Sequence, residues 1–306
     1  MIQLTNKDYN TIPEPLTRAG TYRQISRAVL ATNGEFYNTT YYKDLAVVNK
    51  LKAFSVHRNI LEPGDKPKCY YCESHVEHVA VLQVEHFRPK AKVDSIDNNN
   101  LPHRGYYWLG LEWSNLLLSC PNCNGKNAKG NRFPLEDFNN RVTAINPIIS
   151  VPQLPLVYDR TSCIANHAPL INERPLLLNP EYEDPTPHLT FDEFGQIYGV
   201  GDKGEKSVEI YTLDRDPLVA ARQEKLNAII RDINLACAAR DRNAIDNNSL
   251  IIWFETTCTK ILELDDIRKE YCLWGRYIIA NFENCVVSKI DEYKTELRVA
   301  FQNVNI

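Results

Sequence analysis

The sequence predicts an α+β fold, in which a small zinc-stapled module of two strands and a short helix is flanked by N- and C-terminal helical regions. Apolar residues recur at spacings of three and four in the first 60 residues and again toward the C-terminus, as expected for amphipathic helices. Between these regions, two Cys-x2-Cys pairs enclose short strand-like segments. With 306 residues and 43% hydrophobic content, the chain can bury a large core, and its length suggests about two domains.

The first half of the chain divides at a turn-rich segment. Residues 1–60 form the N-terminal helical region, whose apolar residues are spaced for helices: Ile25, Ala28, Val29, Leu45, Val48, Leu51 and Phe54. The prolines and glycine of residues 61–67 end this pattern. The zinc-bounded module occupies residues 61–137. Within it we expect a strand at 79–86, an asparagine-rich loop at 97–100, a second strand at 115–119 and a short helix after Cys120.

The second half begins with a proline-rich stretch of poor periodicity. Residues 138–206 are therefore expected to be irregular, to wrap the module and to end in a hairpin that turns at Gly195. Residues 207–306 form the C-terminal helical region. Its first helix is expected to start with Asp216 as N-cap and Pro217 in the first turn. Three further helical segments complete this region.

Four cysteines have the spacing of a structural zinc site. Cys69 and Cys72 form one pair and Cys120 and Cys123 the other, so the chain supplies the four thiolates of a closed tetrahedral site. The intervening 47 residues must then form a folded insert whose ends are joined by zinc. An alternative site would combine Cys69 and Cys72 with His75 and His78, but it leaves the second pair without a role.

The other five cysteines show no ligand spacing and are typical of buried core thiols: Cys163, Cys237, Cys258, Cys272 and Cys285. An odd total of nine, with no secretory segment in the sequence, argues against a disulfide framework and indicates a reducing, cytoplasmic compartment. No apolar run approaches the roughly 20 residues that a membrane span requires, so no membrane insertion is expected.

The charge balance limits how the chain could bind a polyanion. The formal net charge is −4, whereas sequence-independent binding to phosphates normally uses a basic surface. Any nucleic-acid contact must therefore be local. Residues 84–134 contain seven Lys or Arg against four acidic residues, a modest excess in the segment that carries the motifs.

Three motifs inside the cysteine frame resemble the HNH endonucleases, whose fold is the ββα-metal module: residues 84–89 (VEHFRP), 115–120 (NLLLSC) and 120–124 (CPNCN). Further segments resemble the PtuB-type HNH subunits of Septu antiphage defence and related retron-associated HNH proteins: residues 107–109, 112–115, 129–135 and 175–180. This resemblance covers roughly residues 68–217. The N-terminal helices and the last ninety residues match only in general character.

The resemblance implies a role for each motif residue. His86 would be the general base that takes a proton from water, and Glu85 and Asn124 would bind one Mg²⁺ or Mn²⁺ ion. Asn115 would hold the His86 loop in position by hydrogen bonds across the hairpin. Position 85 is Glu where many family members have Asp, and Asn127 and Asn131 remain alternatives to Asn124 as metal ligand.

Several residues of the module have two interpretations. Four basic residues are candidates for phosphate contact, although such residues usually form a solvated face: Arg88, Lys126, Lys129 and Arg132. Four aromatic residues could stack on bases but more often belong to a core: Tyr106, Tyr107, Trp108 and Trp113. His75, His78 and His103 are less suited to catalysis, because no motif surrounds them.

Taken together, the resemblance predicts a cytoplasmic, metal-dependent HNH endonuclease that hydrolyses phosphodiester bonds of DNA as the nuclease component of an antiphage system. Its expected cofactors are a structural Zn²⁺ and a catalytic Mg²⁺ or Mn²⁺. Its expected partner is an ABC-type ATPase of the PtuA kind, with retron components as a further possibility. The alternatives are a catalytically silent zinc-stapled binding module and a stand-alone restriction-type HNH nuclease.

Overall fold

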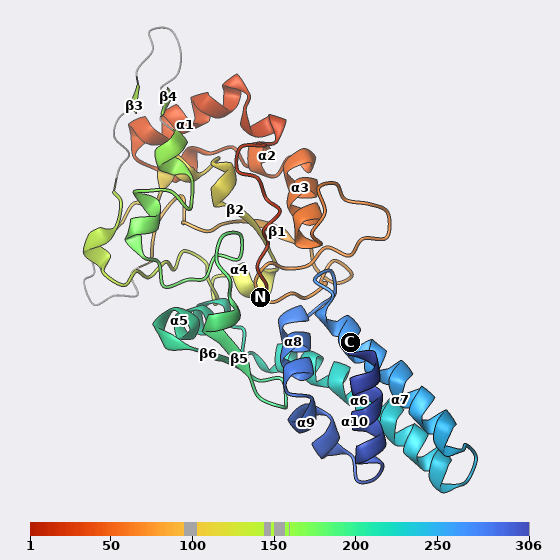
Figure 1. Ribbon diagram of the computed structural model, residues 1–306. Coiled ribbons are helices and arrows are strands. Elements are labelled where there is room, and N and C mark those ends of the chain that lie inside the picture. The colour runs from red at the N-terminus through yellow and green to blue at the C-terminus, as the bar shows by residue number, and fades with distance from the viewer. Residues whose placement is uncertain (95–102, 144–147, 150–156, 159, 306) are drawn as a thin grey trace.

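The structure is a computed structural model that describes residues 1–94, 103–143, 148–149, 157–158 and 160–305. The N-terminal helices and the C-terminal helices lie at opposite ends of the molecule, and the cysteine-containing module lies between them (Figure 1). The mixture of helices and small two-stranded sheets confirms the predicted α+β class. The predicted asparagine-rich loop at 97–100 lies outside the described residues. Within them, no helix combines the length and apolar character needed to cross a membrane.

The N-terminal region is helical, as its apolar spacing predicts. It contains α1 (Ala19–Ala31), α2 (Thr39–Tyr42) and α3 (Leu45–Ser55), with 3-10 turns at Glu14–Leu16 and Gly34–Phe36. Asn38 and Asp44 cap α2 and α3, because their side chains accept hydrogen bonds from backbone N–H groups of the first turn. Val47, Leu51 and Phe54 of α3 are buried, which directs this helix toward the module.

The central module contains an antiparallel strand pair followed by a short helix. Strand β1 (Gln83–His86) pairs with β2 (Leu116–Ser119), and His86 lies opposite Leu116. Helix α4 (Pro121–Asn124) follows directly, and 3-10 turns at Tyr107–Leu109 and Trp113–Asn115 precede β2. The predicted order is confirmed, but the first strand begins at Gln83 rather than Val79. The helix also ends at Asn124, so the later basic residues do not lie on it as expected.

The next region is largely irregular, as its prolines predict. Its described residues contain β3 (Ile148–Ile149), β4 (Val157–Tyr158) and 3-10 turns at Phe138–Asn140, Arg160–Cys163, Leu170–Glu173 and Thr186–His188. The expected hairpin is formed by β5 (Leu189–Phe191) and β6 (Ile197–Gly199). Gly195 has a φ of 86° in its turn, a conformation that glycine adopts without a steric penalty. Helix α5 (Gly201–Tyr211), which sequence reasoning missed, follows the hairpin.

The C-terminal region is a group of helices. It contains α6 (Asp216–Asp241), α7 (Asn247–Leu262), α8 (Cys272–Ala280), α9 (Phe282–Cys285) and α10 (Lys294–Val304), with 3-10 turns at Glu263–Asp265 and Val287–Lys289. Helix α7 packs against both α6 and α10 (Figure 1). The expected N-cap at Asp216 is wrong: Arg215 is the N-cap of α6, and Asp216 is already helical, in the acidic first turn that the helix dipole favours.

The C-terminal region is hydrogen-bonded to the loop that carries the first cysteine pair. The ammonium group of Lys68 donates hydrogen bonds to the carbonyl oxygens of Ile267 (2.5 Å) and Lys269 (2.9 Å). The backbone N–H of His75 donates to a carboxylate oxygen of Glu270 at 2.7 Å. Since Lys68 is buried, these contacts also satisfy a charged group that would otherwise be costly to remove from water.

Candidate functional site

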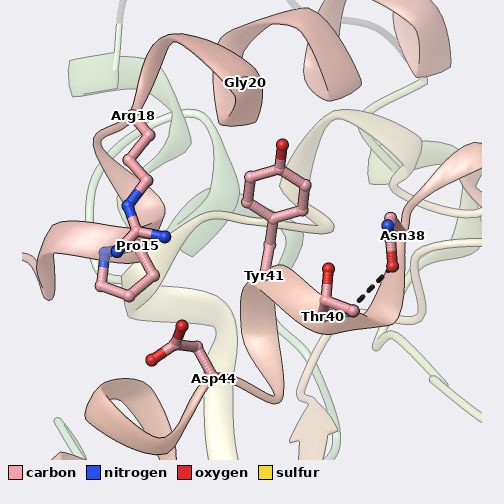
Figure 2. A pocket seen from close by; sticks show the side chains of 7 residues that line it. All are labelled: Pro15, Arg18, Gly20, Asn38, Thr40, Tyr41 and Asp44. Atoms are coloured by element: carbon pink, nitrogen blue, oxygen red, sulfur yellow. Dashed lines mark hydrogen bonds between the residues drawn. The ribbon is translucent and has the colours of Figure 1, made fainter.

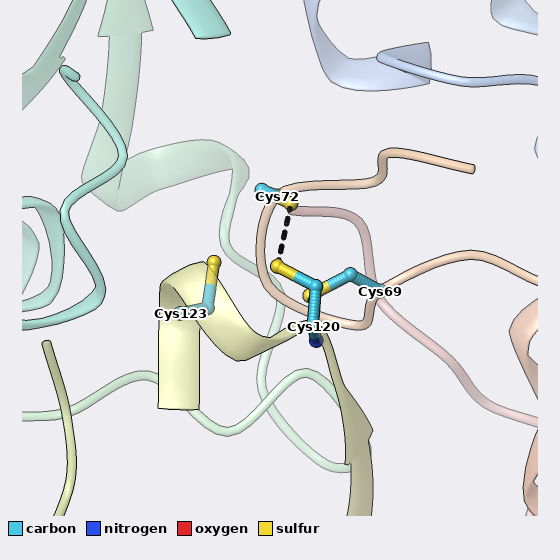
Figure 3. A group of neighbouring side chains, drawn as sticks. All are labelled: Cys69, Cys72, Cys120 and Cys123. Atoms are coloured by element: carbon cyan, nitrogen blue, oxygen red, sulfur yellow. Dashed lines mark hydrogen bonds between the residues drawn. The ribbon is translucent and has the colours of Figure 1, made fainter. Parts of the chain in front are cut away.

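The four cysteines of the two Cys-x2-Cys pairs form one cluster. Their sulfur atoms all lie within 4.8 Å of one another, and all four residues are buried. Cys69 and Cys72 lie on a loop, Cys120 follows β2 and Cys123 lies on α4 (Figure 3). The strand pair therefore carries the second cysteine pair toward the first. Four converging thiols at this separation suit a tetrahedral zinc site.

The surroundings of the cluster also suit zinc thiolates. The backbone N–H of Cys120 donates to the sulfur of Cys69 at 3.3 Å, and the guanidinium group of Arg215 donates to the sulfur of Cys123 at 3.6 Å. Such donors orient metal ligands and stabilise their negative charge. The alternative site with His75 and His78 is not formed. The ring of His75 is hydrogen-bonded to the carbonyl oxygen of Pro67, and His78 is exposed.

A cavity of about 200 Å³ lies beside the C-terminal end of β1. Its lining includes Glu85 and His86 from the strand, and Asn124 and Asn131 from the segment after β2. The fold thus brings together the predicted base and three of the predicted oxygen ligands. Asn127, the third asparagine considered as a metal ligand, is exposed and does not line this cavity.

The ring of His86 is held on two sides. Its Nε2 atom lies 2.9 Å from the carbonyl oxygen of Gly110, so this nitrogen carries the proton and Nδ1 keeps a free lone pair. The ring of Tyr42 packs edge-to-face with it, with 4.9 Å between centroids. Burial, and then the nearby Lys90, lower the pKa of His86 to about 3. The ring is therefore uncharged at neutral pH, with Nδ1 as its free acceptor atom.

Glu85 is buried and forms an ion pair with Lys129, which is also fully buried. Burial raises the pKa of Glu85, while the positive charge of Lys129 opposes this shift. The ion pair engages Oε1 of the carboxylate, whereas Oε2 meets no hydrogen-bond donor of normal geometry within the described residues. A buried carboxylate with unused acceptor capacity is suited to bind a hard divalent cation.

Asn115 joins the two sides of the hairpin through its side-chain amide. Its Oδ1 atom accepts a hydrogen bond from the backbone N–H of Arg88 at 2.8 Å. Its Nδ2 atom donates to the carbonyl oxygens of Arg88 (3.0 Å) and Leu109 (3.2 Å). Because Asn115 is buried, these three bonds fix the backbone that follows His86.

The structure corrects two of the four candidates for phosphate contact. Arg88 is fully buried, and its guanidinium group donates to Glu173 at 2.8 Å and to the carbonyl oxygen of Leu170 at 2.7 Å. Lys129 is buried against Glu85 and also donates to the carbonyl oxygen of His86 at 2.9 Å. Both cations are therefore structural in this arrangement. Lys126 is exposed and Arg132 is half-buried, so both remain open to a ligand.

Sequence reasoning missed Tyr42 and Glu173 as neighbours of the site. Tyr42 comes from α2, and Glu173 from a 3-10 turn far along the chain. Neither residue belongs to a recognisable motif, so no local signal could have identified it. The four aromatic residues of the module are buried, which confirms their interpretation as core: Tyr106, Tyr107, Trp108 and Trp113.

A second cavity, of about 320 Å³, lies in the N-terminal region between the starts of α1 and α2 (Figure 2). Arg18 and Asp44 both line it, and Arg18 is already ion-paired with Glu14. Asn38 uses its side chain to cap α2. The mixed charges of this cavity favour neither an anion nor a cation, and its lining includes none of the predicted site residues.

The fold and the site define an α+β protein with a buried four-cysteine cluster that could hold a metal ion, next to a strand hairpin that carries Glu85 and His86. The chain is similar to the Septu protein PtuB of Bacillus mycoides strain KBAB4, at 34% identity over 199 residues. This match covers 64% of the chain and 58% of PtuB, so the chain spans less than two thirds of the length of that relative. The resemblance to PtuB noted from the motifs is thereby confirmed.

A second similarity involves the Septu protein PtuA of the same strain. The identity is 32% over 158 residues, which make up 51% of the chain but only 19% of PtuA. The shared part is thus about half of this chain and a small segment of a much longer protein. No family model and no solved structure matches the chain.

Proposed function

We propose that the chain is a metal-dependent endonuclease of the HNH type that hydrolyses phosphodiester bonds of DNA. The observation that carries the proposal is the cavity in which Glu85, His86, Asn124 and Asn131 meet. Glu85 and His86 reach it from the last two positions of β1, and Asn124 reaches it from the end of α4. An imidazole can serve as the base for hydrolysis of a phosphodiester, and a carboxylate and an amide can hold the one metal ion that assists it.

In this proposal His86 is the general base. Its Nε2–H is held by the carbonyl oxygen of Gly110, which leaves Nδ1 to accept a proton from water. The edge of the Tyr42 ring and the hydrogen bonds of Asn115 restrict where the imidazole can lie. Such fixed orientation reduces the entropy that the reaction must otherwise lose.

Glu85 and Asn124 would hold a Mg²⁺ or Mn²⁺ ion, with Asn131 as the alternative amide. When bound, the ion stabilises negative charge that develops on the phosphate and the leaving oxygen. Asn124 donates its amide N–H to Gln83 at 3.3 Å, which leaves the amide oxygen as its ligand atom. Lys126 and Arg132 follow α4, where they can contact flanking phosphates of the substrate.

The similarity to PtuB supports a place in a Septu antiphage system. We propose that the chain is the nuclease component of such a system and that its partner is a PtuA-like ABC-type ATPase, with retron components as a further possibility. The C-terminal helices are not needed for hydrolysis and offer surface for such a partner. Because the net charge is −4, a partner could also supply part of the DNA-binding surface.

A second candidate function is a catalytically silent module that binds a nucleic acid or a protein. One observation favours it: the charge of Lys129 already balances Glu85, the residue that would bind the metal ion. A stand-alone restriction-type nuclease is a third possibility, which co-purification with an ATPase would exclude.

The test is nicking of supercoiled plasmid by the purified chain with Mg²⁺ or Mn²⁺. Three proteins are compared, namely wild type, His86→Ala and a His78→Ala control that removes an exposed imidazole away from the cavity. We expect wild type and His78→Ala to cut, and both a chelator and His86→Ala to abolish cutting. Equal cutting by His86→Ala would exclude His86 as the base. If none of the proteins cuts DNA even after addition of the ATPase, the result favours the catalytically silent binding module over the nuclease.

A further inference from the structure

Lys90 lines the same cavity as His86 but belongs to none of the motifs assigned above. It lies four residues beyond the end of β1, and its side chain is half-buried. The lining of the cavity therefore includes a lysine in addition to Glu85, His86 and the two asparagines. Asn124 and Asn131 approach from the other segment that lines the cavity.

Among the described residues, the ammonium group of Lys90 has no anionic partner. Arg88 is paired with Glu173 and Lys129 with Glu85, whereas Lys90 forms no ion pair with any carboxylate in the described part of the chain. Burial and then the charge of Lys43 lower the pKa of Lys90, and the charge of Glu35 only partly opposes them. A half-buried cation without a counter-charge is stabilised when an anion enters beside it.

Tyr42 connects this ammonium group to the imidazole. The hydroxyl of Tyr42 lies 3.3 Å from Nζ of Lys90, and the ammonium group also lies over the Tyr42 ring, 5.0 Å from its centroid. The same ring contacts His86 edge-to-face, with the two ring planes at 83°. Tyr42 is itself buried at the end of α2, so the N-terminal helical region sets the positions of both groups.

We propose that Lys90 binds a phosphate oxygen of the nucleic-acid backbone beside His86, and that Tyr42 is the positioning residue that holds Lys90 there. This inference rests on the proposed nuclease function and names a phosphate contact that the motifs do not assign. A single ammonium group recognises phosphate without reading base sequence. Lys90 therefore contributes to affinity for any phosphodiester backbone rather than to sequence choice.

The experiment measures binding of a fluorescein-labelled 20-base-pair DNA duplex by fluorescence anisotropy, over a series of salt concentrations and without divalent cations. The parent protein is the His86→Ala full-length chain, which we expect to bind without cutting. Lys90→Ala and Lys90→Arg are made in this parent. The matched control is Lys206→Ala, which removes an exposed lysine on α5 that is paired with Glu209.

We expect Lys90→Ala to weaken binding about tenfold and to reduce the slope of log affinity against log salt by about one, because one phosphate contact is lost. Lys90→Arg should retain most of the slope, and Lys206→Ala should match the parent. An unchanged slope in Lys90→Ala overturns the inference and leaves the nuclease proposal standing. A parent protein that binds no duplex even at low salt overturns the proposed DNA substrate itself.

The role of Tyr42 is tested in the same assay with Tyr42→Phe, which removes only the hydroxyl. We expect binding to weaken about twofold with an unchanged salt slope, because the charge of Lys90 remains. In the Lys90→Ala background, Tyr42→Phe should have no further effect, since the group that it positions is gone. Equal losses in both backgrounds would show that Tyr42 acts on the fold and not through Lys90.

Discussion

The buried ammonium group of Lys129 forms an ion pair with the carboxylate of Glu85 in the wall of the cavity that His86 lines. The same ammonium group donates a hydrogen bond to the carbonyl oxygen of His86. One lysine from the segment after α4 thus fixes both the side chain and the backbone at the end of β1. The pair is fully removed from water, so each charge depends on the other.

Lys129→Met should therefore lower the free energy of unfolding by about 3–5 kcal/mol, because it leaves a buried carboxylate without its partner. The double variant Glu85→Gln/Lys129→Met should recover most of this loss. Urea denaturation of both single variants and the double variant measures the coupling. Lys126→Met is the matched control, since Lys126 is exposed. Additive losses in the double variant would show that the two groups do not interact.

Asn115→Ala should destabilise the chain by about 3 kcal/mol, because three buried hydrogen-bonding groups of the backbone lose their partner. It should also reduce plasmid nicking, since the backbone after His86 is no longer held. Asn122→Ala, at an exposed position on α4, is the control for both measurements. Stability equal to that of wild type would mean that solvent replaces these bonds without cost.

Freshly purified protein should contain about one zinc ion per chain, because four buried thiols converge on one point. Cys72→Ser should lose the zinc and lower the melting temperature, as expected where metal binding is coupled to folding. Cys237→Ser should keep it, since Cys237 is half-buried and distant from the cluster in the sequence. Elemental analysis decides the matter, and its failure to find zinc in wild type would exclude the site.

The free energy of unfolding should fall as the pH is lowered from about 6.5 toward 4. Burial lowers the pKa of both His57 and His103 to about 4, whereas the unfolded residues titrate near about 6.5. In this interval the unfolded chain binds protons that the folded chain does not, so acid favours unfolding.

His57→Asn isolates one contribution to this pH dependence. His57 has a φ of 54°, and asparagine tolerates this left-handed conformation. We expect the variant to lose less stability than wild type between pH 6.5 and pH 4.5, as measured by urea denaturation. Identical pH profiles of the two proteins would mean that folding does not change the pKa of His57.

The elements that could be predicted from the sequence are those whose signal is local. Helix α3 follows from apolar spacing, the hairpin at Gly195 from its turn residue, and the cysteine cluster from two pairs of ligands. Each of these depends on residues close together in the chain. Helix α5 was missed because it begins directly after the hairpin with a glycine and charged residues, which resemble a loop.

The environment of the candidate site could be predicted only in part. The sequence placed Glu85 and His86 in one motif and Asn124 in another, but it could not show that Lys129 and Arg88 are buried. A lysine or arginine is nearly always exposed, and its burial depends on a carboxylate partner that the tertiary fold supplies. For the same reason the contact between Tyr42 and Lys90 is invisible before the chain is folded.

The hydrogen bonds between the C-terminal region and the loop of Cys69 and Cys72 have a consequence for how the chain unfolds. Lys68 and His75 flank Cys69 and Cys72, and both are bonded to residues 267–270, between α7 and α8. When α7 and α8 unfold, the loop of Cys69 and Cys72 loses these hydrogen bonds. When the cysteine cluster opens, residues 267–270 lose their partners in that loop. Heating should therefore produce one cooperative transition, in which helix content is lost and the four thiols become exposed to solvent at the same temperature.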